Sequence, residues 1–199
     1  LSKTGKFQGK AKRIMKTADV IIVGSGASGL FNALFLPQDY KVIVITKKEV
    51  EESDSFLAQG GISALKNPED YTAYFEDTMK AGHYENDKGA VEKMIKESPQ
   101  IIQDLKDFGV RFDLKDGEIE FTREGGHSTF RILHHEDLTG KEITSHLYEE
   151  AKKRDNITIM ENCMMIDIIE KDGECKGIVY KDQDGNFDTI EAPDTVLAT

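Results

Sequence analysis

The sequence predicts an α/β fold in which a doubly wound parallel sheet is accompanied by a small β-meander. Three observations support this prediction. Two short apolar runs, at residues 20–23 and 42–45, flank a stretch with helical spacing. A glycine-rich turn directly follows the first run. From residue 157 onward the apolar residues follow a strand-like pattern, with Asp-Gly pairs between the runs.

The first of these elements form a βαβ unit. Residues 20–23 read Val-Ile-Ile-Val, which is typical of a strand buried on both faces. Leu30 and Leu34 recur at helical spacing within residues 27–36, and Pro37 is expected to end that helix. The apolar run at 42–45 supplies the second strand. Strand, helix and strand in so short a stretch predict two parallel neighbours in one sheet.

The rest of the chain is less regular. Residues 53–65 are rich in Gly, Ser and Ala, and no element is predicted there. Helices are expected over 70–81 and 88–108, the second with Pro99 as a break or kink and Gly109 as its end. Residues 110–135 are expected to hold short strands or loops. The capping-box pattern Thr139-Gly-Lys-Glu142 predicts a helix to about residue 154.

Five strands are expected in the C-terminal part, at residues 157–160, 164–170, 176–181, 187–191 and 195–198. Asp172-Gly173 and Asp184-Gly185 are typical turn pairs and would connect the strands of the meander.

Composition limits the classes of function. The 199 residues carry 26 Lys and Arg against 37 Asp and Glu, a net charge of -11. Five of the basic residues and no acid lie within residues 1–14, so the remainder is more acidic still. Such a surface repels a phosphate backbone, which argues against a nucleic acid partner. The chain length suits one sizeable core.

Residues 1–14 are expected to be a tag remnant or a disordered leader, since they lack the apolar core of a secretory signal. Residues 15–199 would form the domain. No run approaches the roughly 18 apolar residues of a membrane helix, so no membrane association is expected. Cys163 and Cys175 are too few for a disulfide framework, which favours a cytoplasmic location.

The glycine-rich turn has the pattern G-x-G-x-x-G, formed by Gly24, Gly26 and Gly29 between a strand and a helix. The first glycine permits a tight turn, the second lets a pyrophosphate approach the backbone, and the third allows close packing of helix on strand. The free N–H groups of the helix start would receive the anion. The pattern in this context predicts dinucleotide binding.

The acid that usually binds ribose at the end of the second strand is missing. Thr46 and Lys47 stand there instead. A hydroxyl can still bond to a ribose and the lysine could lie near phosphate, although the alternative is a solvated turn. This departure argues against NAD and leaves FAD or NADP open.

A second glycine segment, residues 53–62, has small side chains and the pair Gly60-Gly61. Without a Cβ, this pair would let the main chain lie against a flat ring or a phosphate. The alternative reading is a flexible loop.

Residues 122–128 combine a base, an acid, an imidazole and hydroxyls around another Gly-Gly pair. Hydrogen-bond donors for a small dicarboxylate are available from Arg123, His127, Thr122 and Ser128, and Glu124 could hold an ammonium group. The alternative is a polar surface turn.

The other histidines give no metal signal. Neighbours in sequence, His134 and His135 are expected to point apart, and no metal site is predicted. His83 and His146 are expected on helix surfaces.

These segments, in this order, resemble the succinate dehydrogenase/fumarate reductase flavoprotein superfamily, and within it the L-aspartate oxidase family most of all. The resemblance rests on residues 20–29, 53–62 and 122–128, and on Arg-Ile-Leu-His-His-Glu-Asp-Leu-Thr-Gly at residues 131–140. It covers nearly all of residues 15–199. It implies a Rossmann-like FAD-binding domain, present here as its N-terminal part, with the capping domain absent from this chain.

The resemblance also implies which residues contact FAD. Ser or Thr followed by Lys after the second strand is usual in this superfamily, so Thr46 and Lys47 favour FAD. Succinate-oxidising relatives join flavin covalently to a His where this sequence has Asp54, so the flavin is expected to be non-covalent. The expected contacts are Gly24, Ser25, Gly26, Ala27, Ser28, Gly29, Thr46, Lys47, Asp54, Ser55, Phe56, Leu57, Ala58, Gln59, Gly60 and Gly61.

The activity implied by the resemblance is oxidation of L-aspartate to iminoaspartate with oxygen or fumarate as acceptor. This is the first step of de novo NAD biosynthesis, a branch of pyridine nucleotide biosynthesis, and it implies a functional link to quinolinate synthase. Glu124 would orient the substrate amino group, with Thr122, His127 and Ser128 near the carboxylates. The fragment itself is expected to be inactive. The alternatives are a soluble fumarate reductase flavoprotein and a non-catalytic FAD-binding module.

Overall fold

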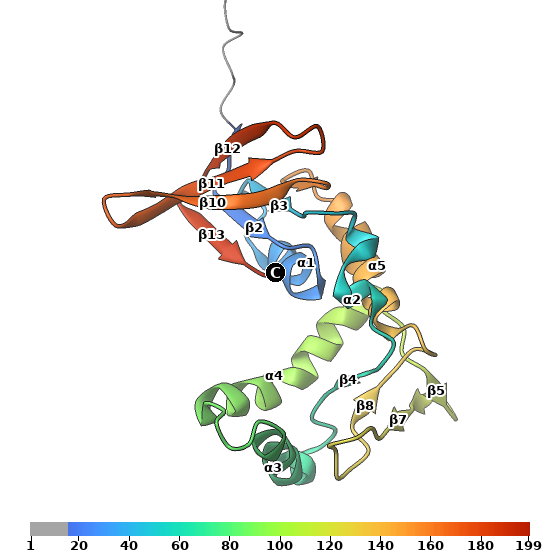
Figure 1. Ribbon diagram of the computed structural model, residues 1–199. Coiled ribbons are helices and arrows are strands. Elements are labelled where there is room, and N and C mark those ends of the chain that lie inside the picture. Colours follow the sequence, from blue (N-terminus) through green and yellow to red (C-terminus); the bar gives the residue numbers. More distant parts are fainter. Residues whose placement is uncertain (1–15) are drawn as a thin grey trace, which may run out of the picture.

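The computed structural model describes residues 16–199 (Figure 1). The expectation of a tag remnant or leader at residues 1–14 lies outside the described residues. None of the described helices is long and apolar enough to cross a membrane.

A four-stranded parallel sheet forms the centre of the fold. Its strand order is β13-β2-β3-β9, and each neighbouring pair is parallel. The bounds of these strands are Asp194–Leu197 for β13, Val20–Val23 for β2, Val42–Ile45 for β3 and Ile157–Met160 for β9. Every residue of β2 and β3 is buried, which confirms for β2 the expectation of a strand covered on both faces.

Two layers cover this sheet, and alternate residues of each strand face one or the other. Helices α1 (Ala27–Phe35) and α5 (Thr139–Lys152) pack in the same core as Ile22 and Val44. Ile21 and Ile43 pack on the opposite face, against residues of the meander. The central strands therefore lie between helices and a second sheet.

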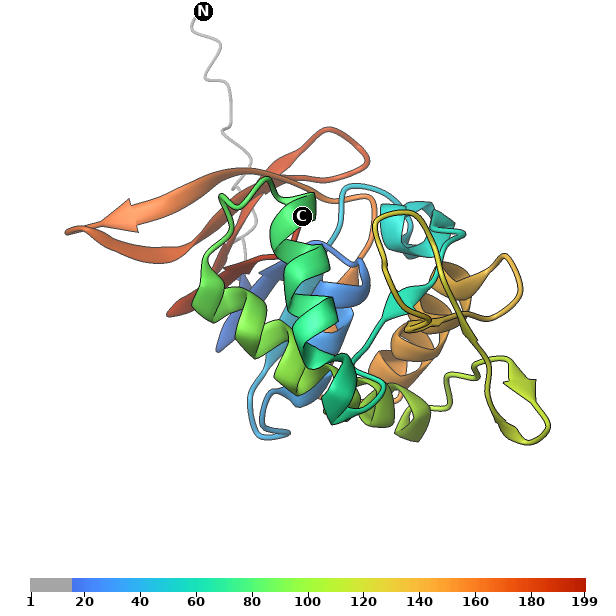
Figure 2. The same ribbon diagram turned by 90° about the horizontal axis from the view of Figure 1, so that it is seen from below.

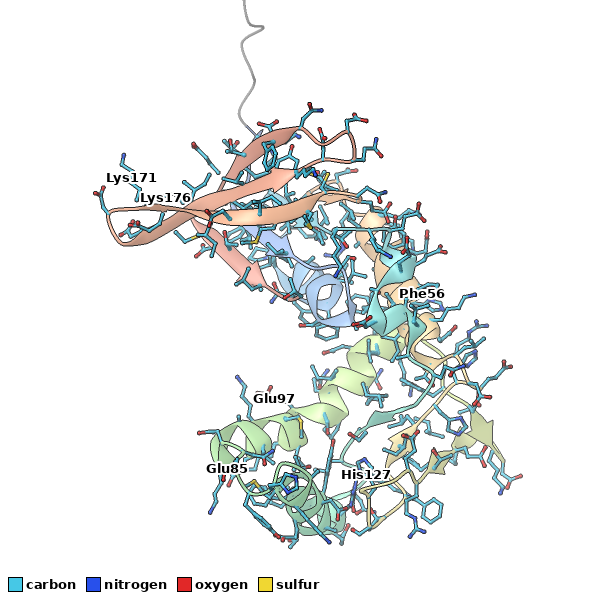
Figure 3. The ribbon with its side chains drawn as sticks, viewed as in Figure 1. Phe56, Glu85, Glu97, His127, Lys171 and Lys176 are labelled. Atoms are coloured by element: carbon cyan, nitrogen blue, oxygen red, sulfur yellow. The ribbon has the colours of Figure 1, made fainter. Side chains whose placement is uncertain are left out.

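The second sheet is the predicted meander, formed by β10 (Met164–Lys171), β11 (Glu174–Lys181) and β12 (Phe187–Glu191). The short strand β1 (Lys16–Thr17) joins β12 in parallel. Asp172 and Gly173 have φ of 57° and 79°, which confirms the predicted turn. The β10–β11 hairpin extends beyond the sheet, with Lys171 near its tip (Figures 2 and 3). The strands at 157–160 and 194–197 belong to the parallel sheet instead of the meander.

The lower half of Figure 1 contains α3 (Tyr71–Ala81), preceded by the 3-10 turn η2 (Pro68–Asp70), and α4 (Lys88–Asp107). Pro99 does not break α4. It removes the N–H that would bond to the Ile95 carbonyl, and the Ser98 hydroxyl donates to that carbonyl instead, at 2.7 Å. Gly109, with φ of 93°, ends this helix as predicted.

Several short elements lie around residues 50–65 and 114–133. The segment left without a predicted element contains α2 (Asp54–Leu57), capped by the Ser53 hydroxyl, and β4 (Ile62–Ser63), with η1 (Val50–Glu52) just before α2. β4 pairs with β8 (Ile132–Leu133), and β8 pairs with β7 (Phe121–Thr122). β5 (Leu114–Lys115) and β6 (Glu118–Ile119) form a hairpin.

Two local predictions were wrong. Helix α5 begins at Thr139, but no capping box forms, because the Thr139 hydroxyl accepts from the His135 N–H at 2.9 Å and Glu142 binds Arg111. The Arg111 bonds outweigh burial and lower the pKa of Glu142. His83 lies in the turn after α3, with φ of 53°, and not on a helix surface. His146 does lie on α5.

Candidate functional site

The turn between β2 and α1 has a geometry that requires glycine. Gly24 has φ of 114°, and a Cβ there would lie 2.2 Å from the Ala198 carbonyl oxygen. A Cβ on Gly29 would lie 2.0 Å from the Gly24 carbonyl oxygen. Gly24 therefore serves the turn and Gly29 the close packing of helix on turn, as the motif predicts.

The start of α1 is open to an anion. No side chain caps this helix, and its first turn carries no acid. The first N–H groups of a helix have no partner within it and carry the positive end of the helix dipole. The Ser25 hydroxyl beside them is buried and has no hydrogen-bond partner. Backbone N–H groups beside an unpartnered buried hydroxyl form a donor set that fits a phosphate.

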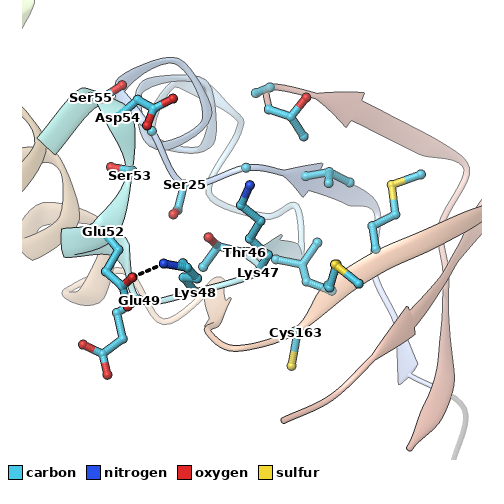
Figure 4. A pocket seen from close by; sticks show the side chains of 18 of the residues that line it. Ser25, Thr46, Lys47, Lys48, Glu49, Glu52, Ser53, Asp54, Ser55 and Cys163 are labelled. Atoms are coloured by element: carbon cyan, nitrogen blue, oxygen red, sulfur yellow. Dashed lines mark hydrogen bonds and ion pairs between the residues drawn. The ribbon is translucent and has the colours of Figure 1, made fainter. Parts of the chain in front are cut away.

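A cavity of about 500 Å³ lies at the carboxyl ends of β2 and β3, next to this helix start (Figure 4). Ser25, Thr46 and Lys47 group near one another in the close view. This cavity is lined by eight of the predicted FAD contacts: Gly24, Ser25, Gly26, Ser28, Thr46, Lys47, Asp54 and Ser55. The side chain of Lys48 does not remain free, because it forms an ion pair with Glu52.

A further wall of this cavity comes from residues outside the predicted contact set. Cys163, Met164 and Met165 lie just before and at the start of β10 and were not indicated by the sequence. Ala198 and Thr199 directly follow β13. The Cys163 N–H bonds to the Thr46 carbonyl at 2.9 Å, which ties this wall to the end of β3. Burial raises the pKa of the Cys163 thiol, so it stays protonated near neutral pH.

A second cavity of about 220 Å³ lies between α1, α2 and α5. Its lining includes five of the predicted contacts: Ala27, Ser55, Ala58, Gly60 and Gly61. The lining residues that were not predicted are Ile62, Thr139, Gly140, Ile143 and Thr144. The Thr144 hydroxyl is buried without a partner. Ser55 lines both cavities.

Four predicted contacts line neither cavity. Gly29 packs beneath the turn instead. Leu57 is exposed and Gln59 is exposed beside it. The Phe56 ring has the Lys141 ammonium 5.8 Å from its centroid. Their contact with a cofactor stays a prediction.

The polar segment 122–128 meets the second glycine segment. The Gly61 N–H donates to the Glu124 carboxylate, with 3.2 Å between nitrogen and Oε1. A Cβ on Gly60 would lie 3.5 Å from the same carboxylate. Two segments that the sequence singled out separately are therefore in contact, and Glu124 lies at the glycine pair that lines the second cavity.

The other polar residues of this segment are held by the protein. Thr122 pairs with Ile132 across β7 and β8. Ser128 donates its N–H and its hydroxyl to Asp77, at 2.7 and 2.8 Å. His127, marked in Figure 3, bonds through Nδ1 to Arg131 at 3.0 Å. Arg123 lies over the Phe130 ring, 5.5 Å from its centroid. These contacts argue against a loose surface turn.

The two adjacent histidines do not point apart, which corrects the prediction. Nδ1 of His134 lies 3.1 Å and Nδ1 of His135 lies 3.5 Å from the Asp113 carboxylate. The extended backbone that would separate neighbouring side chains ends at Leu133. Within residues 16–199, no group of three or more His, Cys, Asp or Glu is placed to hold a metal ion.

A parallel sheet, a glycine turn at its carboxyl edge and an open helix start beside a cavity define a dinucleotide-binding domain of the doubly wound type. The chain belongs to the FAD-binding domain family, which matches it over residues 19–199. FAD is the cofactor of this domain.

Curated relatives with high similarity carry the name L-aspartate oxidase. The protein of Clostridium perfringens is 41% identical over 92% of this chain, and that of Clostridium acetobutylicum is 46% identical over 91%. In each case the match spans only 42% of the relative's own length.

Solved structures of the superfamily share the fold. The Mycobacterium smegmatis Sdh1 complex in the apo form has a chain that matches with a TM-score of 0.83 and 30% identity, over 93% of this chain and 34% of that one. The E. coli quinol fumarate reductase FrdA matches with a TM-score of 0.87 and 26% identity, over 93% and 33%. The doubly wound FAD-binding fold is thereby confirmed.

The residues present fit FAD. The unpartnered hydroxyls of Ser25 and Thr144 lie in the two cavities, and the glycine turn leaves backbone N–H groups open between them. A dinucleotide needs both a phosphate site and room for its rings. The helix start offers the phosphate site, and the larger cavity beside it offers room for the rings.

Proposed function

We propose that this chain is the flavin-binding part of an enzyme that oxidises L-aspartate to iminoaspartate, with oxygen or fumarate as the acceptor. The contact between Glu124 and Gly61 carries the proposal, because it sets a carboxylate at the glycine pair beside the cofactor cavities. A carboxylate in that place suits an ammonium group of a substrate. The identity of 41–46% with relatives named L-aspartate oxidase supports the choice of amino acid.

The cofactor would be held without a covalent bond. The open start of α1 and the Ser25 hydroxyl would bind the pyrophosphate, and Thr46 and Lys47 would meet the adenosine part. Gly60 and Gly61 would let the main chain lie against the flavin ring. When bound, FAD accepts the hydride from the substrate.

The substrate would be held by the segment from residue 122 to residue 128. Glu124 would orient the amino group, with Thr122, His127 and Ser128 near the two carboxylates. Ser128 already donates its hydroxyl to Asp77. Ser128 would therefore contact the substrate from a loop that Asp77 holds in place.

Because the chain spans less than half of its curated relatives, we propose that it is inactive alone and that residues 15–199 are the N-terminal part of the FAD-binding domain. Residues 1–14 would be a tag remnant or a leader. We further propose a cytoplasmic enzyme at the first step of NAD biosynthesis, functionally linked to quinolinate synthase.

The test is an assay of the full-length enzyme with a panel of amino acids and dicarboxylates. Oxygen consumption and peroxide release should appear with L-aspartate. Fumarate should replace oxygen as acceptor in an anaerobic assay. Oxidation of succinate without oxidation of aspartate would overturn the proposal.

The likeness to the E. coli quinol fumarate reductase, with a TM-score of 0.87, favours a soluble fumarate reductase as the second candidate. The same assay separates the two, since a fumarate reductase would not release peroxide with aspartate. A third possibility is a non-catalytic FAD-binding module, which would retain flavin absorbance after purification but oxidise none of the panel.

A further inference from the structure

A buried arginine lies behind the polar segment. Arg131 is fully buried, and four of its N–H groups have partners. It forms a two-pronged pair with Asp70, with Nε and Nη2 at 2.7 and 2.8 Å from the two carboxylate oxygens. Nη1 donates to Asp77 at 2.7 Å and to His127 at 3.0 Å. A buried guanidinium needs such partners, because burial without them is strongly unfavourable.

Both carboxylates come from the region of α3, Asp70 as its N-cap residue and Asp77 from within the helix. Asp70, Tyr74 and Asp77 are spaced by four and three residues, so they lie above one another along the helix. The guanidinium carbon of Arg131 lies 4.8 Å from the centroid of the Tyr74 ring. The Arg131 hydrogen bonds, with a smaller contribution from Thr129, lower the pKa of Asp70. Burial opposes ionisation of Asp77, but bonds from Ser128 and Arg131 outweigh it and lower that pKa too.

Tyr74 and Arg131 also contact the residues that directly follow the second glycine segment. The Tyr74 hydroxyl bonds to the Ser63 hydroxyl at 2.7 Å, and the Ala64 N–H donates to the Arg131 carbonyl at 3.1 Å. Ser63 follows Gly61 by two residues, on β4. One buried network therefore joins the segment beside the cavities to the segment that carries Glu124 and His127.

The contact between Arg131 and His127 determines where the imidazole proton lies. An arginine can only donate, so Nδ1 of His127 must accept from Nη1. In the neutral ring the proton then lies on Nε2. The ring is half-buried, with the Tyr74 ring centroid 6.4 Å away on one side.

We infer that Arg131 is a positioning residue that fixes His127 in the tautomer with the proton on Nε2, leaving that N–H as a donor for a substrate carboxylate. The part of this inference that concerns substrate rests on the proposed function. The tautomer itself does not, and it can be measured without substrate.

The first experiment measures the tautomer in the 15N-labelled chain by long-range proton–nitrogen correlation spectra. The chain has five histidines, and the His127 signals are identified by their loss in His127→Gln. We expect the unprotonated nitrogen to be Nδ1 and the protonated one Nε2. A proton on Nδ1 would overturn the inference whatever reaction the enzyme catalyses.

The second experiment uses Arg131→Lys, which keeps the charge between the two carboxylates but loses the second donor of the fork. We expect this variant to show both neutral tautomers of His127. Thr129→Val is the matched control, because it removes only the 2.6 Å bond from Thr129 to Asp70 and leaves the Arg131–His127 bond intact. An unchanged tautomer in Arg131→Lys, or a mixed one in Thr129→Val, would contradict the assigned role.

The third experiment measures steady-state kinetics in the full-length enzyme. Arg131→Lys should raise KM for the dicarboxylate about tenfold or more and change kcat less, because the lost donor serves binding. If Arg131→Lys does not fold, the spectrum of the unaltered chain still decides the inference. If aspartate proves not to be a substrate but the predicted tautomer is found, the proposed function fails and the positioning role remains.

Discussion

The main-chain N–H of Gly61 donates to a carboxylate oxygen of Glu124, with 3.2 Å between the two atoms. The two residues are 63 positions apart in the chain. Their contact brings a negative charge to a point where the backbone carries no side chain. A glutamine could keep this hydrogen bond through its amide oxygen, but it would lose the charge. Geometry and charge can therefore be separated at this position.

Glu124→Gln should lower the rate of aspartate oxidation by about 10- to 100-fold, the effect of losing a hydrogen bond to a charged group. Fumarate reduction should fall less, because fumarate has no ammonium group to pair with the carboxylate. Both rates are measured with the same enzyme preparation. Glu118→Gln, on the exposed hairpin, is the control and should change neither. Equal losses in the two reactions would refute the role of Glu124.

Gly26→Ala should weaken FAD binding while the chain still folds. A Cβ there would lie 2.8 Å from the Ser55 hydroxyl, which can turn away, so the cost to the fold is small. The same Cβ would enter the approach to the helix start, and we expect a Kd at least about tenfold higher. Flavin fluorescence on titration measures it. Gly125→Ala, with nothing within 4 Å of its Cβ, is the control.

The βαβ unit and its glycine turn were predictable because their signals are local. The apolar run of β2, Gly24 and the helical spacing of α1 all lie within sixteen consecutive residues, and each obeys a short-range rule. The loop with Glu124 was singled out from its composition alone. Its approach to Gly61 could not be read from sequence, since that contact depends on the pairing of β4 with β8.

Contacts between residues far apart in the chain account for what the sequence did not predict. Strands β9 and β13 were expected as strands without an assigned partner, and they pair in parallel with β3 and β2. The residues of β9 and β13 do not by themselves indicate a parallel partner so far away in the chain. Glu142 matched a capping box, but Arg111, from another segment, binds it instead. Cys163 entered the cavity wall for the same reason, through a bond to Thr46.

The flavin should be released when the full-length protein is denatured. The residues lining the two described cavities include no histidine and a single cysteine, Cys163. Burial raises the pKa of that thiol, so little of the nucleophilic thiolate is present at neutral pH. Asp54 lines the larger cavity, at the position expected to replace a flavin-linked histidine. After acid precipitation the flavin absorbance should remain in the supernatant, and flavin in the pellet would contradict a non-covalent site.

The two carboxylates that bind Arg131, Asp70 and Asp77, should make the free energy of unfolding sensitive to acid. The pKa values of Asp70 and Asp77 lie below their ordinary value of 3.8 in the folded chain. Their ionised forms thus stabilise the fold, fully above pH 3.8 and progressively less as the pH falls below it toward the lowered values. Asp70→Asn should flatten this dependence, measured as the urea midpoint against pH. Glu97→Gln should leave the pH dependence unchanged, because Glu97 is exposed and its ion pair with Lys93 is long, at 4.0 Å.

Ser98 and Pro99 should be coupled in stability. The Ser98 hydroxyl donates to the Ile95 carbonyl and accepts from the Leu65 N–H, at 2.7 and 2.9 Å. Ser98→Ala leaves both groups buried without this partner and should lower the free energy of unfolding by about 1–3 kcal/mol. In a Pro99→Ala background the new N–H of residue 99 can bond to the Ile95 carbonyl, so the same substitution should cost less. Urea unfolding of the four proteins completes the cycle. Equal costs in the two backgrounds would show that the hydroxyl does not replace the bond that proline removes.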